Sequence, residues 1–292
     1  PDAPARMTTL RIEPLCDALG ARIEGIDLAA PLSDDDADAI LGAFERHHLL
    51  VFPQQRLAPE QQVAFCRRFG TVQPEGPNGA DWTFVSNRAE RGILEETAIS
   101  FHVDFLFLEH PVEAICLYAE TLPAGGTRTR SASNARPLER MGAQERRALD
   151  GLVVRNVADF AHPQQDIVRY RAGPAPPGAL AREAPLVRRH PRLPVDVLGC
   201  CHQQTECLVG LSDADSARLL AQLFDEELYA EHNVHEHHWR EGDLVIWDNL
   251  AVQHGRPAAR LADGERTLRR VTVSATSAVA ALMEALGARA TG

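Results

Sequence analysis

The sequence predicts a mainly β protein whose helices flank the strands. Short runs that are apolar, or that alternate apolar and polar residues, recur along most of the chain between glycines and prolines. Apolar residues at helical spacing are confined to a few segments, two of which come before most of the strands. With 292 residues, 45% of them hydrophobic, the chain can bury one large core or two small ones.

The first seventy residues combine short strands with two helices. Residues 10–31 alternate apolar and polar positions around two glycines, which is typical of strands joined by turns. Ser33 precedes three aspartates and then apolar residues at helical spacing, and an acidic first turn suits the positive end of a helix dipole. A buried strand is expected at 49–52, and a second helix is expected over 59–70, beginning at a proline and ending at a glycine.

Two segments are expected to be loops over a site. Residues 71–100 are irregular apart from one short strand near 82–85, and residues 155–194 are so rich in proline and glycine that we expect a lid without packed elements. The pieces on either side of this lid are each too sheet-like to close a core alone, so we expect one domain over 1–292. The other expected elements are strands at 101–107, 112–119 and 266–273, a buried strand between two turns over 239–249, a polar helix at 137–151 and a helix capped by Ser212 with Asp215.

Composition excludes several classes of partner. The formal net charge is −11 and the chain has no lysine, which argues against nucleic acid as a partner. No window approaches roughly 18 consecutive apolar residues, and the start lacks the pattern of a signal peptide. We therefore expect a cytoplasmic protein that acts on a small molecule without a membrane. The sequence is also compatible with a homo-oligomer.

A candidate metal site begins in the apolar run 101–107, where His102 and Asp104 are the only polar residues. On a strand, a spacing of two places both side chains on one face. Taken alone, the pair also fits a strand with one solvated face, and a lone histidine such as His254 is more often a core residue. Together the three residues supply two imidazoles and a carboxylate, the set that leaves three open positions on a non-haem iron.

Two further clusters resemble metal sites less closely. Cys200, Cys201, His202 and Cys207 lack the paired spacing of structural zinc modules, and buried small side chains at a strand end are the favoured interpretation. The histidines in the run 232–238 fall where an edge strand is expected. We predict no second metal site from either cluster.

Several motifs in order resemble one enzyme family. They are His-x-Asp at 102–104, Gly-Gly-Thr at 125–127, Trp-Asp-Asn at 247–249 followed by His254, and two arginines four residues apart at the end. This pattern is similar to the taurine dioxygenase (TauD/TfdA-like) group of Fe(II)/2-oxoglutarate-dependent dioxygenases. The resemblance implies a double-stranded β-helix, or jelly-roll barrel, with flanking helices. It also implies Fe(II) bound by His102, Asp104 and His254, with 2-oxoglutarate and O2 as co-substrates.

The resemblance, combined with strand parity, assigns the binding of 2-oxoglutarate. Arg266 and Arg270 share one face of a strand, while Arg269 points to the other. In the family the first such arginine, with a threonine of the turn, holds the distal carboxylate, and the second reaches the substrate or an adjacent carboxylate. We expect Arg266 and Thr127 in the first role, with Thr129 as the reserve because the family usually has one residue between Gly-Gly and Thr.

Departures from the family pattern bear on the substrate. Taurine dioxygenases carry a histidine soon after an Arg-Phe-Gly helix end, where this chain continues through Gln73 without one, and an asparagine four residues before the first ligand, where this chain has Ala98. Taurine is therefore not the expected substrate. We count Gln73, Ala98, Phe105 and Arg270 as candidate substrate-binding positions, and expect no catalytic residue beyond the metal centre.

The expected reaction is hydroxylation of an unactivated C–H bond of a small polar metabolite, with release of succinate and CO2. One alternative is a zinc-dependent hydrolase or isomerase, because the same ligands do not exclude Zn²⁺. Such an enzyme would not need an arginine pair for a second carboxylate. The other alternative is a barrel that only binds a small molecule.

Overall fold

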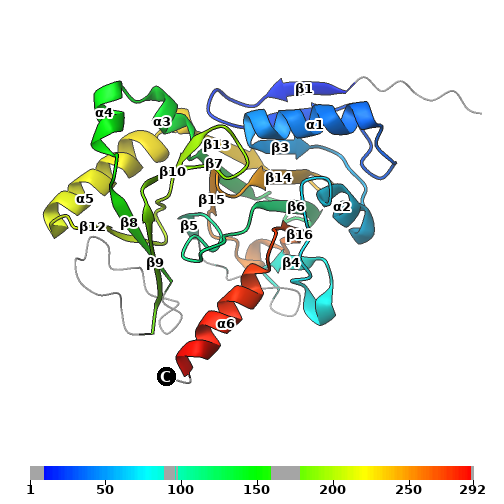
Figure 1. Ribbon diagram of the computed structural model, residues 1–292. Helices are drawn as coiled ribbons and strands as arrows, with labels where there is room; N and C mark the ends of the chain where they lie inside the picture. Colours follow the sequence, from blue (N-terminus) through cyan, green and yellow to red (C-terminus); the bar gives the residue numbers. More distant parts are fainter. Residues whose placement is uncertain (1–9, 89–95, 97, 159–177, 291–292) are drawn as a thin grey trace, which may run out of the picture.

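The core of the fold is a pair of facing, mainly antiparallel sheets, shown in Figure 1. The computed structural model describes residues 10–88, 96, 98–158 and 178–290. The larger sheet has the order β1 (Arg11–Pro14), β2 (Ala21–Glu24), β3 (Leu49–Phe52), β14 (Leu244–Asp248), β6 (Ala114–Thr121), β16 (Thr267–Val273) and β4 (Thr83–Ser86). The smaller sheet has the order β13 (Val234–His238), β7 (Arg128–Ser133), β15 (Val252–Arg256) and β5 (Ile99–His102).

Side-chain alternation divides the larger sheet into an inner and an outer face. In β3 every residue is buried, because Leu49 and Val51 face the core between the sheets and Leu50 and Phe52 face the flanking helices. The inner cluster continues through β6, β14, β16 and Val252 of the smaller sheet. Two facing sheets of this kind form the jelly-roll barrel that the resemblance implies.

Two helices cover the outer face, as expected. Helix α1 (Asp34–His47) is capped by the Ser33 side chain, which accepts a hydrogen bond from the Asp36 amide, and it lies beside β3 in Figure 1. Helix α2 (Pro59–Cys66) begins at the expected proline but ends four residues before Gly70, since residues 67–70 form a turn. None of the described helices is long and apolar enough to cross a membrane.

The predicted lid over 155–194 is partly wrong. Strands β8 (Val153–Ala158) and β9 (Leu180–Pro185) form a third sheet with β12 (Thr205–Val209), and β10 (Val187–Arg189) pairs with β11 (Asp196–Leu198). We call β8, β9 and β12 together with the β10–β11 pair the lid sheets. The prolines of β9 and of the loop after β10 stand at strand ends or between strands, where a missing N–H is tolerated. Residues 159–177 lie outside the described part.

The polar helix predicted at 137–151 is two helices. Helix α3 (Arg136–Arg140) stops at Met141, whose backbone is extended, and α4 (Ala143–Ala148) starts anew because the Glu145 carboxylate accepts a hydrogen bond from the Gly142 amide. Helix α5 (Asp213–Gln222) is capped by Ser212 as predicted. The remaining helices are α6 (Ala278–Ala290), η1 (Pro77–Gly79), η2 (Leu223–Leu228), η3 (Glu231–Asn233) and η4 (Leu261–Asp263).

Candidate active site

Neighbouring strands bring His102, Asp104 and His254 together at one edge of the smaller sheet. β5 ends at His102, and the antiparallel pairing of β15 with β5 places His254 directly opposite it. One ligand atom from each of the three residues lies within 4.8 Å of the others. The imidazole Nε2 atoms of His102 and His254 are 3.0 and 3.7 Å from Oδ1 of Asp104. The predicted ligand set is therefore a spatial cluster.

Asp104 does not lie on a strand, which corrects the prediction for 101–107. The backbone turns after His102, with Phe105 in the left-handed region at φ 60° and the Leu106 amide donating to the Val103 carbonyl. The Asn249 side chain stabilises this turn: its Oδ1 accepts from the Asp104 amide, and its Nδ2 donates to the Asp104 carbonyl, each at 3.0 Å. The turn brings the Asp104 carboxylate back to the two histidines. The position of this carboxylate therefore depends on the turn and not on the alternation of side chains along a strand.

The orientation of the histidines fits a bound cation. Nδ1 of His102 lies 2.9 Å from the Ser100 carbonyl, which can only accept, so Nδ1 carries the proton. In the neutral ring, Nε2 then presents a lone pair to an oxygen of Asp104 only 3.0 Å away. Two acceptors at that distance repel each other unless a proton or metal ion lies between them. The three converging donor atoms therefore fit a divalent metal.

The protonation states of His254 and Asp104 also favour metal binding. Burial, with the nearby His102, lowers the pKa of His254 to about 3, so this imidazole is neutral near pH 7. Burial alone would raise the pKa of Asp104, but the Arg270 guanidinium holds it below its usual range. Neutral imidazoles and an ionised carboxylate are the forms that bind metals.

Arg266 places a buried positive charge near this cluster. It is 1% exposed, its Nε donates to Oγ1 of Thr127 at 3.1 Å, and its buried Nη1 has no hydrogen-bond partner among the described residues. Burial, with the neighbouring Arg256, lowers the pKa of Arg266 to about 9. A buried guanidinium with an unpaired donor is costly unless an anion completes it. The Arg266 guanidinium is therefore suited to bind a carboxylate.

The two threonines occupy different places around Arg266. Thr129 lines the cavity that contains the metal-ligand cluster, and its Oγ1 accepts a 2.9 Å hydrogen bond from Nε1 of Trp239. Thr127 instead lines a neighbouring cavity of about 410 Å³, which Arg266 also borders. Both threonines thus lie near the guanidinium, but only the reserve candidate faces the metal-ligand side.

The prediction that Arg266 and Arg270 share one face of the last strand, with Arg269 on the other face, is confirmed. Arg266 and Arg270 both line the metal-ligand cavity, whereas Arg269 points to the outer face and donates to the Gln62 side chain and the Leu57 carbonyl. Arg270 donates from Nη2 to Oδ2 of Asp104 at 2.8 Å. It therefore reaches an adjacent carboxylate, one of the two roles expected for it.

The cavity at the cluster has a volume of about 140 Å³, with an apolar wall beside its charged groups. Of the candidate substrate positions only Arg270 lines it. Gln73 donates its amide to the Ser274 carbonyl, Ala98 is exposed, and Phe105 packs on the inner core. The cavity is lined by Val85, Ile99, His102, Asp104, Ile115, Leu117, Thr129, Trp247, His254, Gly255, Arg256, Arg266 and Arg270.

Sequence reasoning missed three residues of this site. Asn249 holds the Asp104 turn, the Trp247 ring lies 4.7 Å from the His254 ring, and Gly255 allows β15 to approach β5, since a Cβ there would lie 2.8 Å from the Ile99 carbonyl oxygen. The signal was present in Trp247-Asp248-Asn249 and in the glycine beside His254. Their roles depend on tertiary contacts that spacing does not encode.

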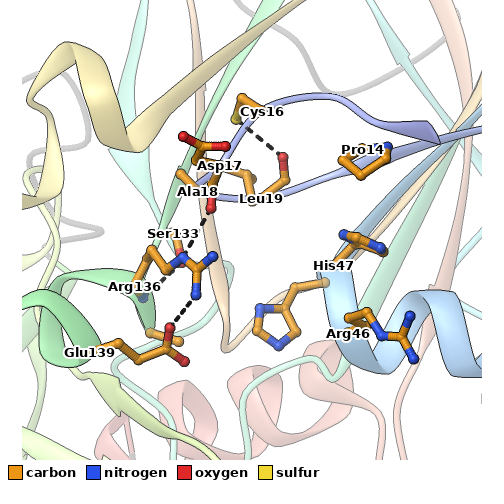
Figure 2. A pocket seen from close by; sticks show the side chains of 12 residues that line it. Pro14, Cys16, Asp17, Ala18, Leu19, Arg46, His47, Ser133, Arg136 and Glu139 are labelled. Atoms are coloured by element: carbon orange, nitrogen blue, oxygen red, sulfur yellow. Dashed lines mark hydrogen bonds and ion pairs between the residues drawn. The ribbon is translucent and has the colours of Figure 1, made fainter.

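The other polar clusters do not form a second metal site within the described residues, where only the three predicted ligands come together. The histidine run 232–238 largely falls on the edge strand β13, as expected. A separate cavity of about 340 Å³ lies between the end of α1 and the start of α3 (Figure 2). Its Arg136 donates to Glu139 and to the Asp17 carbonyl, so this guanidinium is already neutralised.

Comparisons with known proteins identify the family. Residues 11–272 match the family described as "Taurine catabolism dioxygenase TauD, TfdA family". The chain is 30% identical over 268 residues to the (S)-phenoxypropionate/alpha-ketoglutarate-dioxygenase of Delftia acidovorans, covering 85% of this chain and 89% of the relative. It is 29% identical over 264 residues to the alpha-ketoglutarate-dependent sulfate ester dioxygenase of Pseudomonas putida, covering 84% and 83%.

A solved structure is similar across the whole fold. A taurine dioxygenase from Burkholderia xenovorans superposes with a TM-score of 0.75 at 27% identity, covering 91% of this chain and 90% of that one. This likeness confirms the mainly β jelly-roll fold. The resemblance and the cofactor set expected from the sequence are confirmed too. The chain belongs to the TauD/TfdA family of dioxygenases, which depend on Fe(II), 2-oxoglutarate and O2.

Proposed function

We propose that this enzyme couples the oxidative decarboxylation of 2-oxoglutarate to hydroxylation of an unactivated C–H bond in a small polar molecule other than taurine. One O2 is consumed, and the products are succinate, CO2 and the hydroxylated substrate. One observation carries the proposal: a single cavity joins three convergent metal-ligand atoms to a buried guanidinium nitrogen of Arg266 that has no partner among the described residues.

In this proposal His102, Asp104 and His254 would hold the metal, and a set of three protein ligands would leave positions for co-substrates. When bound, Fe(II) supplies the activation of O2 that the oxidation requires. The hydrogen bond from His102 to the Ser100 carbonyl fixes the ring so that Nε2 points toward Asp104, where it would bind the metal. Arg270 pairs with the outer oxygen of Asp104 and keeps this carboxylate ionised.

Arg266 binds the distal carboxylate of 2-oxoglutarate in this proposal, because its fork can meet both carboxylate oxygens. Thr129 lines the same cavity, and since its oxygen already accepts from Trp239, its hydroxyl proton is free to be donated to the carboxylate. We therefore assign the direct contact to Thr129 and the positioning of the Arg266 guanidinium to Thr127.

The substrate is proposed to present an apolar segment to the metal, because Val85, Ile99, Ile115 and Leu117 form the cavity wall. The relatives named for phenoxypropionate and for sulfate esters support a substrate other than taurine. The absence of the family's taurine-binding pair near Gln73 and Ala98 supports the same conclusion. We further propose that the chain is one domain with a cytoplasmic location.

Neither alternative accounts for the whole site. A zinc hydrolase would use the three ligands but has no use for Arg266, and a binding-only barrel has no use for an intact ligand set. The test is a substrate screen with enzyme loaded anaerobically with Fe(II), in which succinate is measured by mass spectrometry. We expect small polar compounds to stimulate succinate release and taurine not to. Release with Zn²⁺ alone, or stimulation by taurine equal to the best compound, would contradict the proposal.

A further inference from the structure

Two arginines on the lid sheets have no acidic partner among the described residues. Arg182 on β9 donates from Nη1 to the Leu108 carbonyl at 2.6 Å, and the Nε of Arg188 on β10 is buried without a hydrogen-bond partner in that part of the chain. The two charges also act on each other, because burial and then the neighbouring Arg182 lower the pKa of Arg188 to about 10. The pair is thus a concentration of positive charge in which Nε of Arg188 is buried and Arg182 is half-buried.

Two nearby arginines of the described fold are compensated by carboxylates. Arg155, on the same lid sheet, is paired with Glu183 and Glu206, and Arg192 is paired with Glu113 and Asp248. Removing an ion from water costs several kcal/mol, so buried charges are normally paired. A buried, unpaired nitrogen of Arg188 beside the half-buried guanidinium of Arg182, with no carboxylate among the described residues, therefore indicates that a ligand supplies the anion.

The pair lies beside the turn that carries Asp104. Arg182 contacts this turn at Leu108, and Nε of Arg188 is 3.7 Å from the position a Cβ would take on Gly199. Two residues after Gly199, Cys201 packs against Val103 and Leu106 of the same turn. Leu108 is four positions after Asp104, a span of at most roughly 14 Å.

The cationic groups nearer the metal are already engaged. Arg270 is paired with Asp104, and Arg266 and Arg256 lie together at the end of the cavity assigned to 2-oxoglutarate. A substrate that carries its own anionic group would need a further cation at some distance from the oxidised carbon. Arg182 and Arg188 provide it on the lid side of the Asp104 turn.

We propose that Arg182 and Arg188 form an anion subsite for the primary substrate, which carries a carboxylate or a sulfate group separated from the reacting C–H bond. The guanidinium fork matches two oxygens of either group. The inference rests on the proposed function, because it names the class of substrate for the same site.

The test measures binding rather than turnover. Protein loaded with Mn(II) and N-oxalylglycine, a non-reactive analogue of 2-oxoglutarate, is titrated by calorimetry with (S)-2-phenoxypropionate and with hexyl sulfate. Their neutral counterparts, 2-phenoxypropanamide and hexanol, are titrated in parallel. The variants are Arg188→Gln and Arg182→Gln, and the matched control is Arg189→Gln, an exposed residue of the same strand. The two anions distinguish a carboxylate from a sulfate subsite.

We expect the wild type to bind at least one anion more tightly than its neutral counterpart. Arg188→Gln should raise the Kd for that anion by about tenfold to a hundredfold, the loss of charge-assisted hydrogen bonds, with less than about a twofold change for the neutral compound. Arg189→Gln should bind as the wild type does. Without ligand, Arg188→Gln should unfold at the same or a higher temperature, because it removes an uncompensated buried charge.

Three results would overturn the subsite. They are no binding of either anion by the wild type, unchanged anion binding in Arg188→Gln, or an equal loss of anionic and neutral ligands with a lower unfolding temperature. If Arg188→Gln does not fold, Arg188→Lys keeps the charge without the fork and is held to the same criteria. Conversion of 2-oxoglutarate to succinate by the same preparations is measured separately, so failure of the subsite is distinguishable from failure of the proposed function.

Discussion

Arg266 is the residue whose burial is hardest to explain without a ligand. It is 1% exposed, it has one side-chain hydrogen bond to Thr127, and its Nη1 is unpaired in the described fold. An uncompensated buried charge reduces stability, and proteins keep such charges chiefly where they bind something. In the proposed function the same guanidinium reduces the stability of the fold and supplies affinity for a dicarboxylate.

Arg266→Gln should weaken binding of N-oxalylglycine by about tenfold to a hundredfold, because the distal carboxylate loses a charge-assisted pair of hydrogen bonds. Binding of Mn(II) should be unchanged, since Arg266 does not touch the ligand cluster. Calorimetry measures both affinities, and the exposed Arg260→Gln is the matched control. Equal affinity of Arg266→Gln and wild type for N-oxalylglycine would exclude the assigned role.

At the scale of elements, the pairing of β15 with β5 sets the distance between the two histidine ligands. His254 stands opposite His102, and the next residue, Gly255, lies so close to β5 that an added Cβ would be 2.8 Å from the Ile99 carbonyl oxygen and 3.1 Å from the Phe101 amide nitrogen. Because the nearby atoms belong to the backbone of β5, no flexible side chain can move aside to accommodate a Cβ. The glycine is thus part of the geometry of the candidate metal site.

Gly255→Ala should separate the two strands, lower the free energy of unfolding by about 1–3 kcal/mol and weaken Mn(II) binding. The matched control is Gly42→Ala in α1, where nothing lies within 4 Å of the added Cβ and helix propensity favours alanine by about 0.5–1 kcal/mol. Urea unfolding and metal titration measure the two effects. Wild-type metal affinity in Gly255→Ala would show that the approach of β15 to β5 does not determine the site.

Much of the element order could be predicted because local signals agree with the fold. Ser33 and Ser212 cap the helices they were expected to cap, and the two-residue period of the last strand separates Arg269 from Arg266 and Arg270. The turn at Asp104 could not be predicted, because an apolar run reads as a strand and the turn depends on Asn249, 145 residues away. The strands within 155–194 were missed because they pair with a distant strand, β12, and with each other.

At the scale of the whole molecule, buried histidines tie stability to pH. The pKa of His254 is about 3 and that of His235 is about 4, both lowered mainly by burial from an ordinary value of 6.5. Between these values and 6.5 the unfolded chain binds protons that the folded chain does not. Stability therefore rises with pH through this window and is lost as the pH falls below about 6.5.

The metal-free protein should show a nearly constant urea midpoint from pH 8 to 7 and a falling one from about pH 6.5 to 4.5. Each buried neutral histidine contributes a slope of about 1.4 kcal/mol per pH unit within the window. His254→Gln should reduce the slope, and the exposed His232→Gln is the matched control. A midpoint that rises as the pH falls from 6.5 would contradict the neutral, buried state of His254.

We propose the assignment of His102, Asp104 and His254 as ligands of the iron with which this enzyme oxidises 2-oxoglutarate. It is tested most directly by the Fe(II)-dependent conversion of 2-oxoglutarate to succinate and CO2, compared between wild type and Asp104→Ala at equal Fe(II). We predict decarboxylation by the wild type and a loss of at least about a hundredfold in Asp104→Ala, in parallel with weaker Mn(II) binding. Undiminished turnover in Asp104→Ala, or none above background in the Fe(II)-loaded wild type, would contradict the account.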